Sequence, residues 1–265
     1  MTERIQYIAG GLLLVLLIAG GGFYVYRDFV PFPETAQSQN SPATTTPKDR
    51  ATVSTPSPAD ATAVELQSPI PDLDRPIVFP AGFPEEAKAL MREKMTTLIA
   101  ILKGNPAEFG AWIDLGIRRK QVEDFEGARQ AWEYAGALQP GNNISFLNLG
   151  ILYHYYLKDF PMAEQNLRLS LVKDPRYPQV YQELHDLYRY SYKQETGGAI
   201  EILKEGIKAT GNINFVIALA KYYRDVKNDT VNARIYFTEA KEQATETGNS
   251  ELAAALEEEL AALPK

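Results

Sequence analysis

The chain has 265 residues, of which 45% are hydrophobic, and its formal net charge is −7. This length allows one or two domains with a buried core. The acidic balance disfavours a broad nucleic-acid-binding surface, so we expect no nucleic-acid partner. The absence of cysteine excludes disulfides, thiolate nucleophiles and cysteine-ligated zinc. With only two histidines, a histidine-rich metal site is also excluded in practice.

Residues 5–26 form an uncharged, strongly apolar stretch behind a short N-terminal tail, residues 1–4. The stretch is long enough to cross a bilayer as one helix, and Tyr7, Tyr24 and Tyr26 lie near its ends, where aromatic rings favour the membrane interface. We therefore predict a single-pass membrane protein that contacts lipid through residues 5–26. Because the short tail is the easier end to keep in the cytoplasm, we expect the rest of the chain to be extracytoplasmic. The alternative is a cleaved signal peptide and a secreted protein.

Residues 27–82 form a linker rich in Pro, Ser and Thr. This composition cannot bury enough apolar surface to offset the entropy of ordering, so we predict a disordered tether over residues 31–64. In the second half of the linker, apolar residues such as Ile77 and Phe79 interrupt the prolines. We predict that residues 66–83 dock in extended form on the domain that follows. A linker that merely carries scattered apolar residues is the alternative.

The rest of the chain is predicted to be helical. In residues 83–104, Phe83 is followed by a proline and two glutamates, which suit a helix start, and then by apolar residues at helical spacing. We assign them as an N-terminal capping helix. Residues 246–265 place leucines on one helical face and glutamates over much of the remainder, as expected of a C-terminal capping helix that closes a helical array.

Residues 109–142 define the unit that is repeated between these caps. Apolar or small residues fall on one face of a first helix and on one face of a second, and a proline ends the unit. They are Trp112, Leu115 and Gly116, then Ala128, Trp132 and Ala135, and finally Pro140. Such a hairpin has one apolar side and cannot cover it alone, so copies of the unit are expected to stack on one another.

This pattern resembles the tetratricopeptide repeat family, and three further units follow in phase. Their corresponding residues are Phe146, Leu149, Gly150, Tyr153, Ala163 and Leu167; Tyr181, Leu184, His185, Tyr188, Ala199 and Leu203; and Phe215, Ala218, Leu219, Tyr222, Ala233 and Phe237. The resemblance implies an all-α fold, a tetratricopeptide-type α-solenoid of antiparallel helix pairs with four repeats over residues 105–245. His185 stands where the family prefers glycine, so we expect it to pack in the core.

The resemblance also implies that partners bind the concave groove lined by the first helix of each repeat. Mapped onto this chain, the first half of that surface is aliphatic and the second half is rich in tyrosine and arginine, residues that anchor interfaces. The predicted groove residues are Ile113, Ile117, Lys120, Leu147, Ile151, His154, Tyr155, Gln182, Asp186, Arg189, Tyr190, Val216, Ala220, Tyr223 and Arg224. A protein or peptide with an apolar segment followed by polar or acidic residues would suit this surface.

The sequence contains no phosphate-binding glycine loop, nucleophile elbow or metal-ligand spacing. We therefore expect no enzyme activity and no cofactor. The favoured function is a membrane-tethered scaffold or adaptor that binds a protein or peptide in a bacterial envelope complex. One alternative is an accessory subunit that presents substrate to a separate enzyme. Another is a self-assembling structural protein, for which a homo-oligomer is possible.

Overall fold

The computed structural model describes residues 69–264. The predicted tail, the transmembrane helix of residues 5–26 and the tether of residues 31–64 lie outside the described residues. Within residues 69–264, no helix combines the length and apolarity needed to cross a membrane. The elements are α3 (Glu85–Gly104), α4 (Phe109–Gln121), α5 (Phe125–Leu138), α6 (Ile144–Leu152), η1 (Tyr153–Leu157), α7 (Phe160–Lys173), α8 (Pro178–Tyr190), η2 (Gln194–Thr196), α9 (Gly198–Thr210), α10 (Ile213–Asp225), α11 (Thr230–Glu246) and α12 (Ser250–Ala262).

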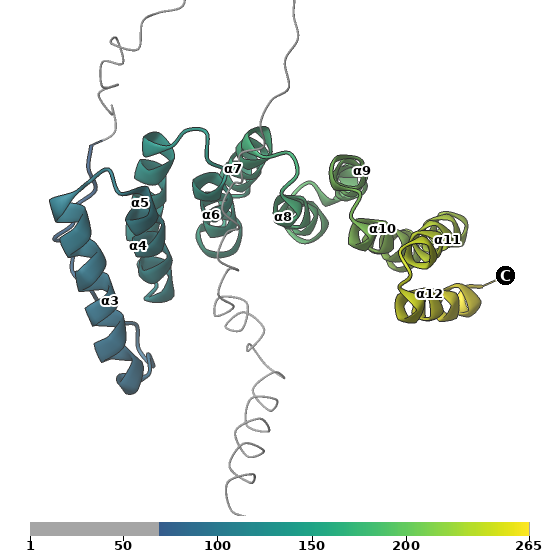
Figure 1. The fold of residues 1–265 in the computed structure, drawn as a ribbon, viewed down its shortest axis with the longest axis horizontal. Coiled ribbons are helices and arrows are strands. Elements are labelled where there is room, and N and C mark those ends of the chain that lie inside the picture. The colour runs from purple at the N-terminus through teal and green to yellow at the C-terminus, as the bar shows by residue number, and fades with distance from the viewer. Residues whose placement is uncertain (1–68, 265) are drawn as a thin grey trace, which may run out of the picture. The chain divides into compact units, whose positions relative to one another are not determined.

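The central helices associate in pairs: α4 with α5, α6 with α7, α8 with α9 and α10 with α11. Each pair also contacts the next one, because α5 packs on α6, α7 on α8 and α9 on α10. Figure 1 shows the row that results, with α7 and α9 on one side and α6 and α8 on the other. The described part of the chain is therefore an all-α helical-repeat solenoid without strands, which confirms this part of the predicted fold class.

Small residues allow the two helices of a pair to approach closely, as the repeat pattern predicts. A Cβ atom added to Gly116 would lie 2.3 Å from the Trp132 indole nitrogen, and one added to Gly150 would lie 2.5 Å from Leu167 Cγ. Both contacts are too short for any side chain larger than hydrogen. At the equivalent position of the third repeat, the His185 ring is buried and its Nδ1 donates to the Ala199 carbonyl at 3.0 Å. The prediction of a core role for this histidine is confirmed.

The turn between the two helices is built in the same way in three repeats. An aspartate caps the second helix by accepting a hydrogen bond from the amide three residues later. The acceptors and donors are Asp124 and Gly127 (3.0 Å), Asp159 and Met162 (3.2 Å), and Asp229 and Asn232 (3.0 Å). The preceding residue has positive φ in each case. The extra residue of the second repeat is absorbed at η1, where the Asp159 amide donates back to the Tyr153 carbonyl.

The capping aspartates show that the fourth repeat is shifted by one residue from its predicted phase. The residue that precedes Asp229 by the distance that separates Gly150 from Asp159 is Ala220. Ala220 is small, as this position requires, whereas the predicted residue, Leu219, is not. The cluster that includes Val216, Ala220 and Phe237 packs α10 on α11. Val216 and Ala220 are fully buried, so they belong to the helix interface and not to an open groove.

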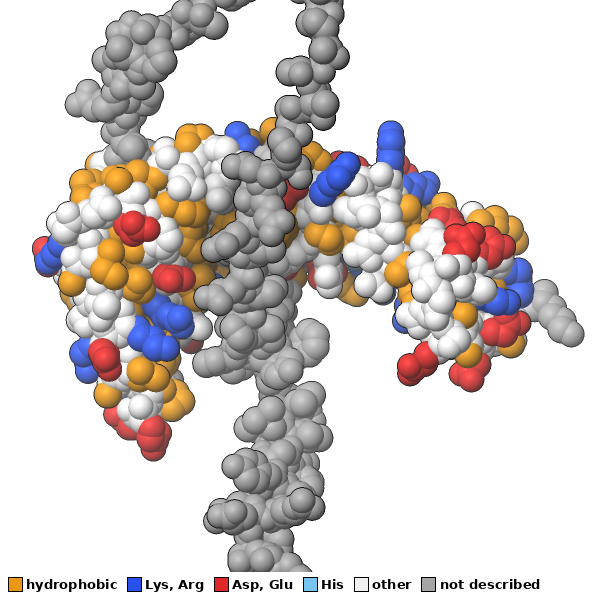
Figure 2. Space-filling model, in the orientation of Figure 1, with side chains coloured by type: hydrophobic (Ala, Val, Ile, Leu, Met, Phe, Trp, Pro, Cys, Tyr) orange, Lys and Arg blue, Asp and Glu red, His pale blue; other side chains and the backbone are white. Residues whose placement is uncertain are grey.

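The two ends of the solenoid are closed differently. At the C-terminal end, α12 buries Leu256 and Leu263 against α10 and α11, and acidic side chains gather on the outside of this end (Figure 2). At the N-terminal end, α3 packs on α4 and is preceded by a non-helical segment, residues 69–80, with a turn at residues 73–74. We name this segment the strap. Its Leu73, Ile77 and Phe79 lie in the same apolar cluster as the core of α3 and the first repeat.

Candidate functional site

The candidate site is the first-helix face, which we define as the surface of α4, α6, α8 and α10 that points away from their partner helices. In the first two repeats this face is aliphatic. Ile113, Ile117 and Ile151 are half-buried and keep part of their side chains accessible. Leu147 is fully buried in the core. The predicted aliphatic end therefore exists, although Leu147 contributes to stability and not to an open surface.

His154 and Tyr155 lie at the end of the second repeat's first helix, in the π-helical turn η1. The His154 side chain is only 2% exposed, and its Nε2 lies 2.9 Å from the Ser191 hydroxyl, just beyond α8. The ring also lies 4.0 Å from that of Tyr155, measured between centroids. His154 thus joins the second and third repeats, whereas the half-buried Tyr155 remains at the surface.

A basic residue recurs at one register position of the first helices, eight residues after the aromatic or apolar residue that opens the motif. The series is Lys120, His154, Arg189 and Arg224. The Lys120 ammonium lies 5.4 Å from the centroid of the Tyr156 ring, within the range of a cation–π contact. His154 is buried, whereas Lys120, Arg189 and Arg224 are half-buried and place basic side chains along one edge of the first-helix face.

Arg189, the third member of this series, is half-buried. Its guanidinium lies 4.8 Å from the centroid of the Tyr190 ring and 5.6 Å from that of Tyr222, the latter buried in α10. The Tyr190 side chain is 59% exposed. Between residues 69 and 264, no carboxylate forms an ion pair with Arg189. The guanidinium thus lies against two aromatic rings. Of the neighbouring predicted residues, Gln182 is exposed and Asp186 is half-buried.

Arg224, by contrast, is already paired within the chain. It forms ion pairs with Glu259 of α12 and, at 2.6 Å, with Asp225. The hydrogen bond that Arg224 donates to Asp225 is the main reason why the pKa of this arginine is raised. Tyr223 does not lie on the first-helix face as predicted. Its ring stacks on that of Tyr236 in α11, with 5.6 Å between centroids and 4° between planes.

The one-residue phase shift explains the placement of Tyr223 and reveals two residues that the sequence analysis missed. In the corrected register, Ile217 and Lys221 of α10 match the positions of Ile113 and Ile117 in α4. Ile217 is half-buried and Lys221 is exposed. Lys221 adds a second cation to the end of the face that carries Arg189. The capping Asp229 was the sequence signal that could have fixed this register.

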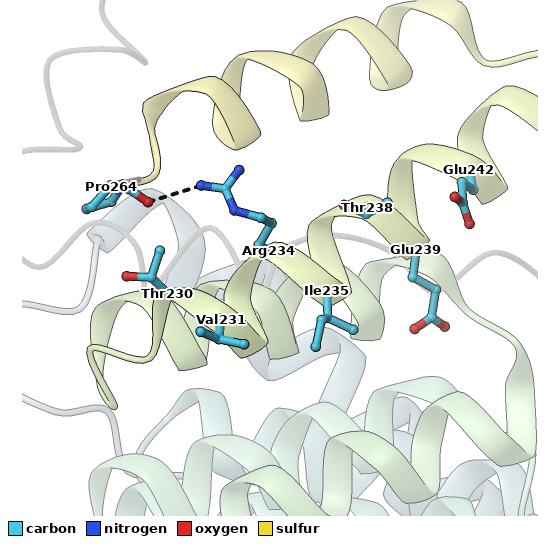
Figure 3. Close-up of a pocket in the computed structure, with 8 residues that line it drawn as sticks. All are labelled: Thr230, Val231, Arg234, Ile235, Thr238, Glu239, Glu242 and Pro264. Carbon is cyan, nitrogen blue, oxygen red and sulfur yellow. Dashed lines mark hydrogen bonds between the residues drawn. The ribbon is translucent and has the colours of Figure 1, made fainter.

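A separate open pocket lies on α11, away from the predicted residues (Figure 3). It has a volume of about 630 Å³ and is lined by Thr230, Val231, Arg234, Ile235, Thr238, Glu239, Glu242 and Pro264. Val231 and Ile235 are 71% and 54% exposed, one helical turn apart. Arg234 points toward the chain's C-terminal end, where its Nη2 donates to the Pro264 carbonyl at 3.0 Å. The pocket is shallow and apolar, with two glutamates at one end.

Metal-binding chemistry finds no support in the described residues. They contain no group of histidine, aspartate or glutamate side chains placed to hold a metal ion. Burial lowers the pKa of His185, whose ring is hydrogen-bonded to the Ala199 carbonyl and lies 5.8 Å from the Tyr222 ring, measured between centroids. The arrangement offers instead a face with an aliphatic end and a cationic, aromatic end, which suits an extended or helical polypeptide.

No protein-family model matches the sequence, and a search of curated proteins finds no relative. Several solved structures are similar in fold. The crystal structure of MamA has 18% sequence identity, covers 65% of this chain and 99% of its own, and gives a TM-score of 0.49. TTC0263, described as a thermophilic TPR protein of Thermus thermophilus, has 19% identity over 66% of this chain and 94% of its own, with a TM-score of 0.43. Yeast Tom70 has 16% identity over 63% of this chain and 39% of its own, with a TM-score of 0.43.

Proposed function

We propose that this chain is a protein–protein interaction scaffold that binds a protein or peptide on the first-helix face of its repeats. The observation that carries the proposal is Arg189. Its guanidinium lies against two tyrosine rings and forms no ion pair among the described residues, although its charge helps to lower the pKa of Asp225; this arginine is placed to bind a partner's carboxylate. Arginine and tyrosine are also the residue types that contribute most to binding energy at interfaces.

The two ends of the face define the chemistry of the partner. Ile113, Ile117 and Ile151 suit an apolar segment, because covering them removes apolar surface from water. Arg189 and Lys221 suit an acidic group beyond that segment, since hydrogen bonds between charged groups are stronger than those between neutral ones. The preferred ligand is therefore a polypeptide with an apolar stretch followed by an aspartate, a glutamate or a terminal carboxylate.

The N-terminal sequence supports a membrane-tethered form of this scaffold. The apolar length of residues 5–26 suits a single transmembrane helix, and the Pro/Ser/Thr-rich linker would carry the repeats clear of the bilayer. We propose an extracytoplasmic repeat domain that serves a bacterial envelope complex, with catalysis supplied by other proteins. Protease protection of the repeats in intact spheroplasts, and their digestion only after lysis, would contradict this topology.

Site-directed photo-crosslinking tests the binding face. Because the chain contains no cysteine, a photoreactive group can be attached at Gln182→Cys on the first-helix face or at Val172→Cys on α7. Both positions are exposed, so the second is a matched control for labelling on another surface. We expect the first probe, in native cells, to yield a discrete crosslinked protein that the control does not yield.

Arg189→Ala in the Gln182→Cys background tests the chemistry of the site. Loss of a charge-assisted hydrogen bond costs about 1.5–3 kcal/mol, so partner affinity should fall by at least roughly tenfold. Equal products from both probes, or a product that is insensitive to Arg189→Ala, would refute this binding face. Crosslinking only to a second copy of the chain would assign the face to self-assembly instead.

A further inference from the structure

The strap is held on the first repeat as an extended peptide would be held in a binding site. Along residues 71–79 of the strap, half-buried and exposed residues alternate, so that one side of the segment lies on the solenoid; residues 73–74 form a turn, and residues 75–80 follow without further turns. Leu73, Ile77 and Phe79 point into the apolar cluster of α3, α4 and α5. Asp72, Asp74 and Val78, between and beside them, are exposed. Every second side chain of this part of the strap therefore packs on the solenoid.

A buried arginine donates hydrogen bonds to the backbone of the strap. The Arg119 side chain on α4 is only 2% exposed, and its guanidinium donates to two strap carbonyls, those of Arg75 and Pro76, each at 2.9 Å. A buried guanidinium without acceptors would carry a large desolvation penalty. Carbonyls that face outward from an extended segment supply the required acceptors. The first repeat thus contains a polar group whose environment is complete only when an extended peptide lies beside it.

An aspartate in the turn after α4 forms an ion pair with an arginine side chain of the strap. Asp124 accepts from Arg75 Nε, with distances of 2.9 and 2.8 Å to its two carboxylate oxygens, and forms an ion pair with Arg119 at 3.0 Å. It also caps α5 through the Gly127 amide. Burial alone would raise the pKa of Asp124, but the hydrogen bonds from Arg75 and Gly127 and the charge of Arg119 hold it below its ordinary value.

The first repeat differs from the second and third at the position of Arg119 in its first helix. Where the first repeat has Arg119, the second and third have tyrosines that contact the second helix of the preceding repeat. Tyr153 lies 3.5 Å from Glu133 of α5, and Tyr188 lies 2.6 Å from Glu164 of α7. In the first repeat the strap supplies the contact instead. The substitution of arginine for tyrosine therefore matches a surface that binds extended backbone.

We propose that this surface of the first repeat is a peptide-binding site, selective for the pattern Leu-x-Arg-Pro-Ile-x-Phe, and that the strap of a second copy of this chain can occupy it. The fit of the strap sequence is shown by its own residues 73–79, and a second copy carries the same sequence. The strap joins α3 through a short turn in which the Phe83 amide donates to the Pro80 carbonyl at 3.1 Å and Gly82 has positive φ. This turn is the hinge about which such an edge segment would be exchanged between copies, once the contacts of the strap with α3 and the first repeat are released.

The test uses the full chain and a labelled peptide with the sequence of residues 69–83, followed by fluorescence anisotropy. In the wild-type protein the tethered strap competes at an effective concentration in the millimolar range, so uptake of the peptide should be weak. Arg75→Ala loosens the protein's own strap and leaves Arg119 and Asp124 intact. We expect this variant to bind the peptide at least tenfold more tightly than the wild type does.

Two further variants define the specificity. Asp124→Asn, added to Arg75→Ala, removes the charge that pairs with the peptide's arginine but keeps an N-cap residue for α5. Binding of the peptide should therefore be lost while the helix content of the protein is unchanged. Lys103→Ala is the control, because it removes only the exposed contact of α3 with Asp74 of the strap, and such pairs contribute little. This control should resemble the wild type. Failure of a helical Arg75→Ala variant to bind the peptide, or equal uptake by the Asp124→Asn variant, would overturn the proposal.

If Arg75→Ala does not fold, the wild-type sequence still provides a test. A donor dye on Asp72→Cys and an acceptor dye on Glu123→Cys, placed in separate full-length populations, report whether a strap lies on another copy. Energy transfer that rises with protein concentration and is abolished by excess peptide would support exchange. Absence of transfer at all concentrations, or transfer that the peptide does not affect, would overturn it.

Discussion

Trp132 should be the most sensitive single position of the first repeat. Its side chain is 1% exposed, and its indole nitrogen donates to the Ile113 carbonyl at 3.1 Å across the helix pair. In Trp132→Ala the cavity cannot be filled from α4, because the facing residue is Gly116, which has no side chain. Truncating a buried tryptophan costs about 3–5 kcal/mol, and we expect the upper half of that range here.

Urea denaturation followed by circular dichroism measures this loss. For a domain of this size, about 4 kcal/mol corresponds to a fall of roughly 10 °C in melting temperature. Val172→Ala is the matched control, because Val172 lies exposed on α7 and surface substitutions of this kind usually stay within about 0.5 kcal/mol. A loss below about 1 kcal/mol for Trp132→Ala would refute the packing of α4 on α5 described above.

Three further outcomes follow from the packing and the buried charges. Gly150→Ala should cost about 1–3 kcal/mol because its Cβ would overlap Leu167, whereas Gly141→Ala, which meets no atom within 4 Å, should be neutral in the same thermal melt. Because burial lowers the pKa of His185, its stabilising contribution is present above the ordinary histidine pKa of about 6.5 and is lost as the pH falls. Denaturation midpoints should therefore drop between pH 7 and pH 5, and less so in His185→Gln. Because the pKa of Asp124 is depressed, its contribution is lost only as the pH falls below the ordinary aspartate value of about 3.9. In that range, hydrogen exchange should show deprotection of the strap in the wild type but no such transition in Asp124→Asn.

The helix pairs could be predicted from the sequence because their signal is local and repeated. Trp112 and Gly116 on one helix and Trp132 on the next describe a large residue against a small one, and only a helical hairpin brings them together. His185 was predicted to be buried for the same reason, since it stands at the position of the small residue. Repetition adds weight to each assignment, because four units must agree on one register.

The predicted register of the fourth repeat is wrong by one residue, because this repeat matches the family pattern less well than the first two do. Phe215 and Leu219 looked like the aromatic and small positions, and both are indeed buried, so an apolar pattern alone cannot separate the two phases. The turn could have separated them. Asp229 caps α11 as Asp124 caps α5, and counting back from it places Ala220 beside the second helix. Polar capping residues fix a register more sharply than a broad apolar stripe does.

The strap chemistry could not be read from the sequence, because it depends on contacts between residues far apart in the chain. Arg75 and Asp124 meet across 49 positions, and Arg119 reaches the strap across 43 and 44. In the sequence, Arg119 is one of several basic residues on an amphipathic helix. Such a residue is usually solvated. Only the structure shows that this arginine is buried and that strap carbonyls accept its hydrogen bonds.

The strap site and the first-helix face use different sides of the same helix. On α4, Ile113 and Ile117 belong to the face, whereas Arg119, two residues further on, holds the strap. A peptide at either site therefore contacts α4 without obstructing the other. Coupling between two sites requires that they bias a shared two-state element, and α4 is the helix that both sites contact. If occupancy of the strap site changes partner affinity at the face, Arg75→Ala, which loosens the strap, should change that affinity, and added strap peptide should restore the wild-type value.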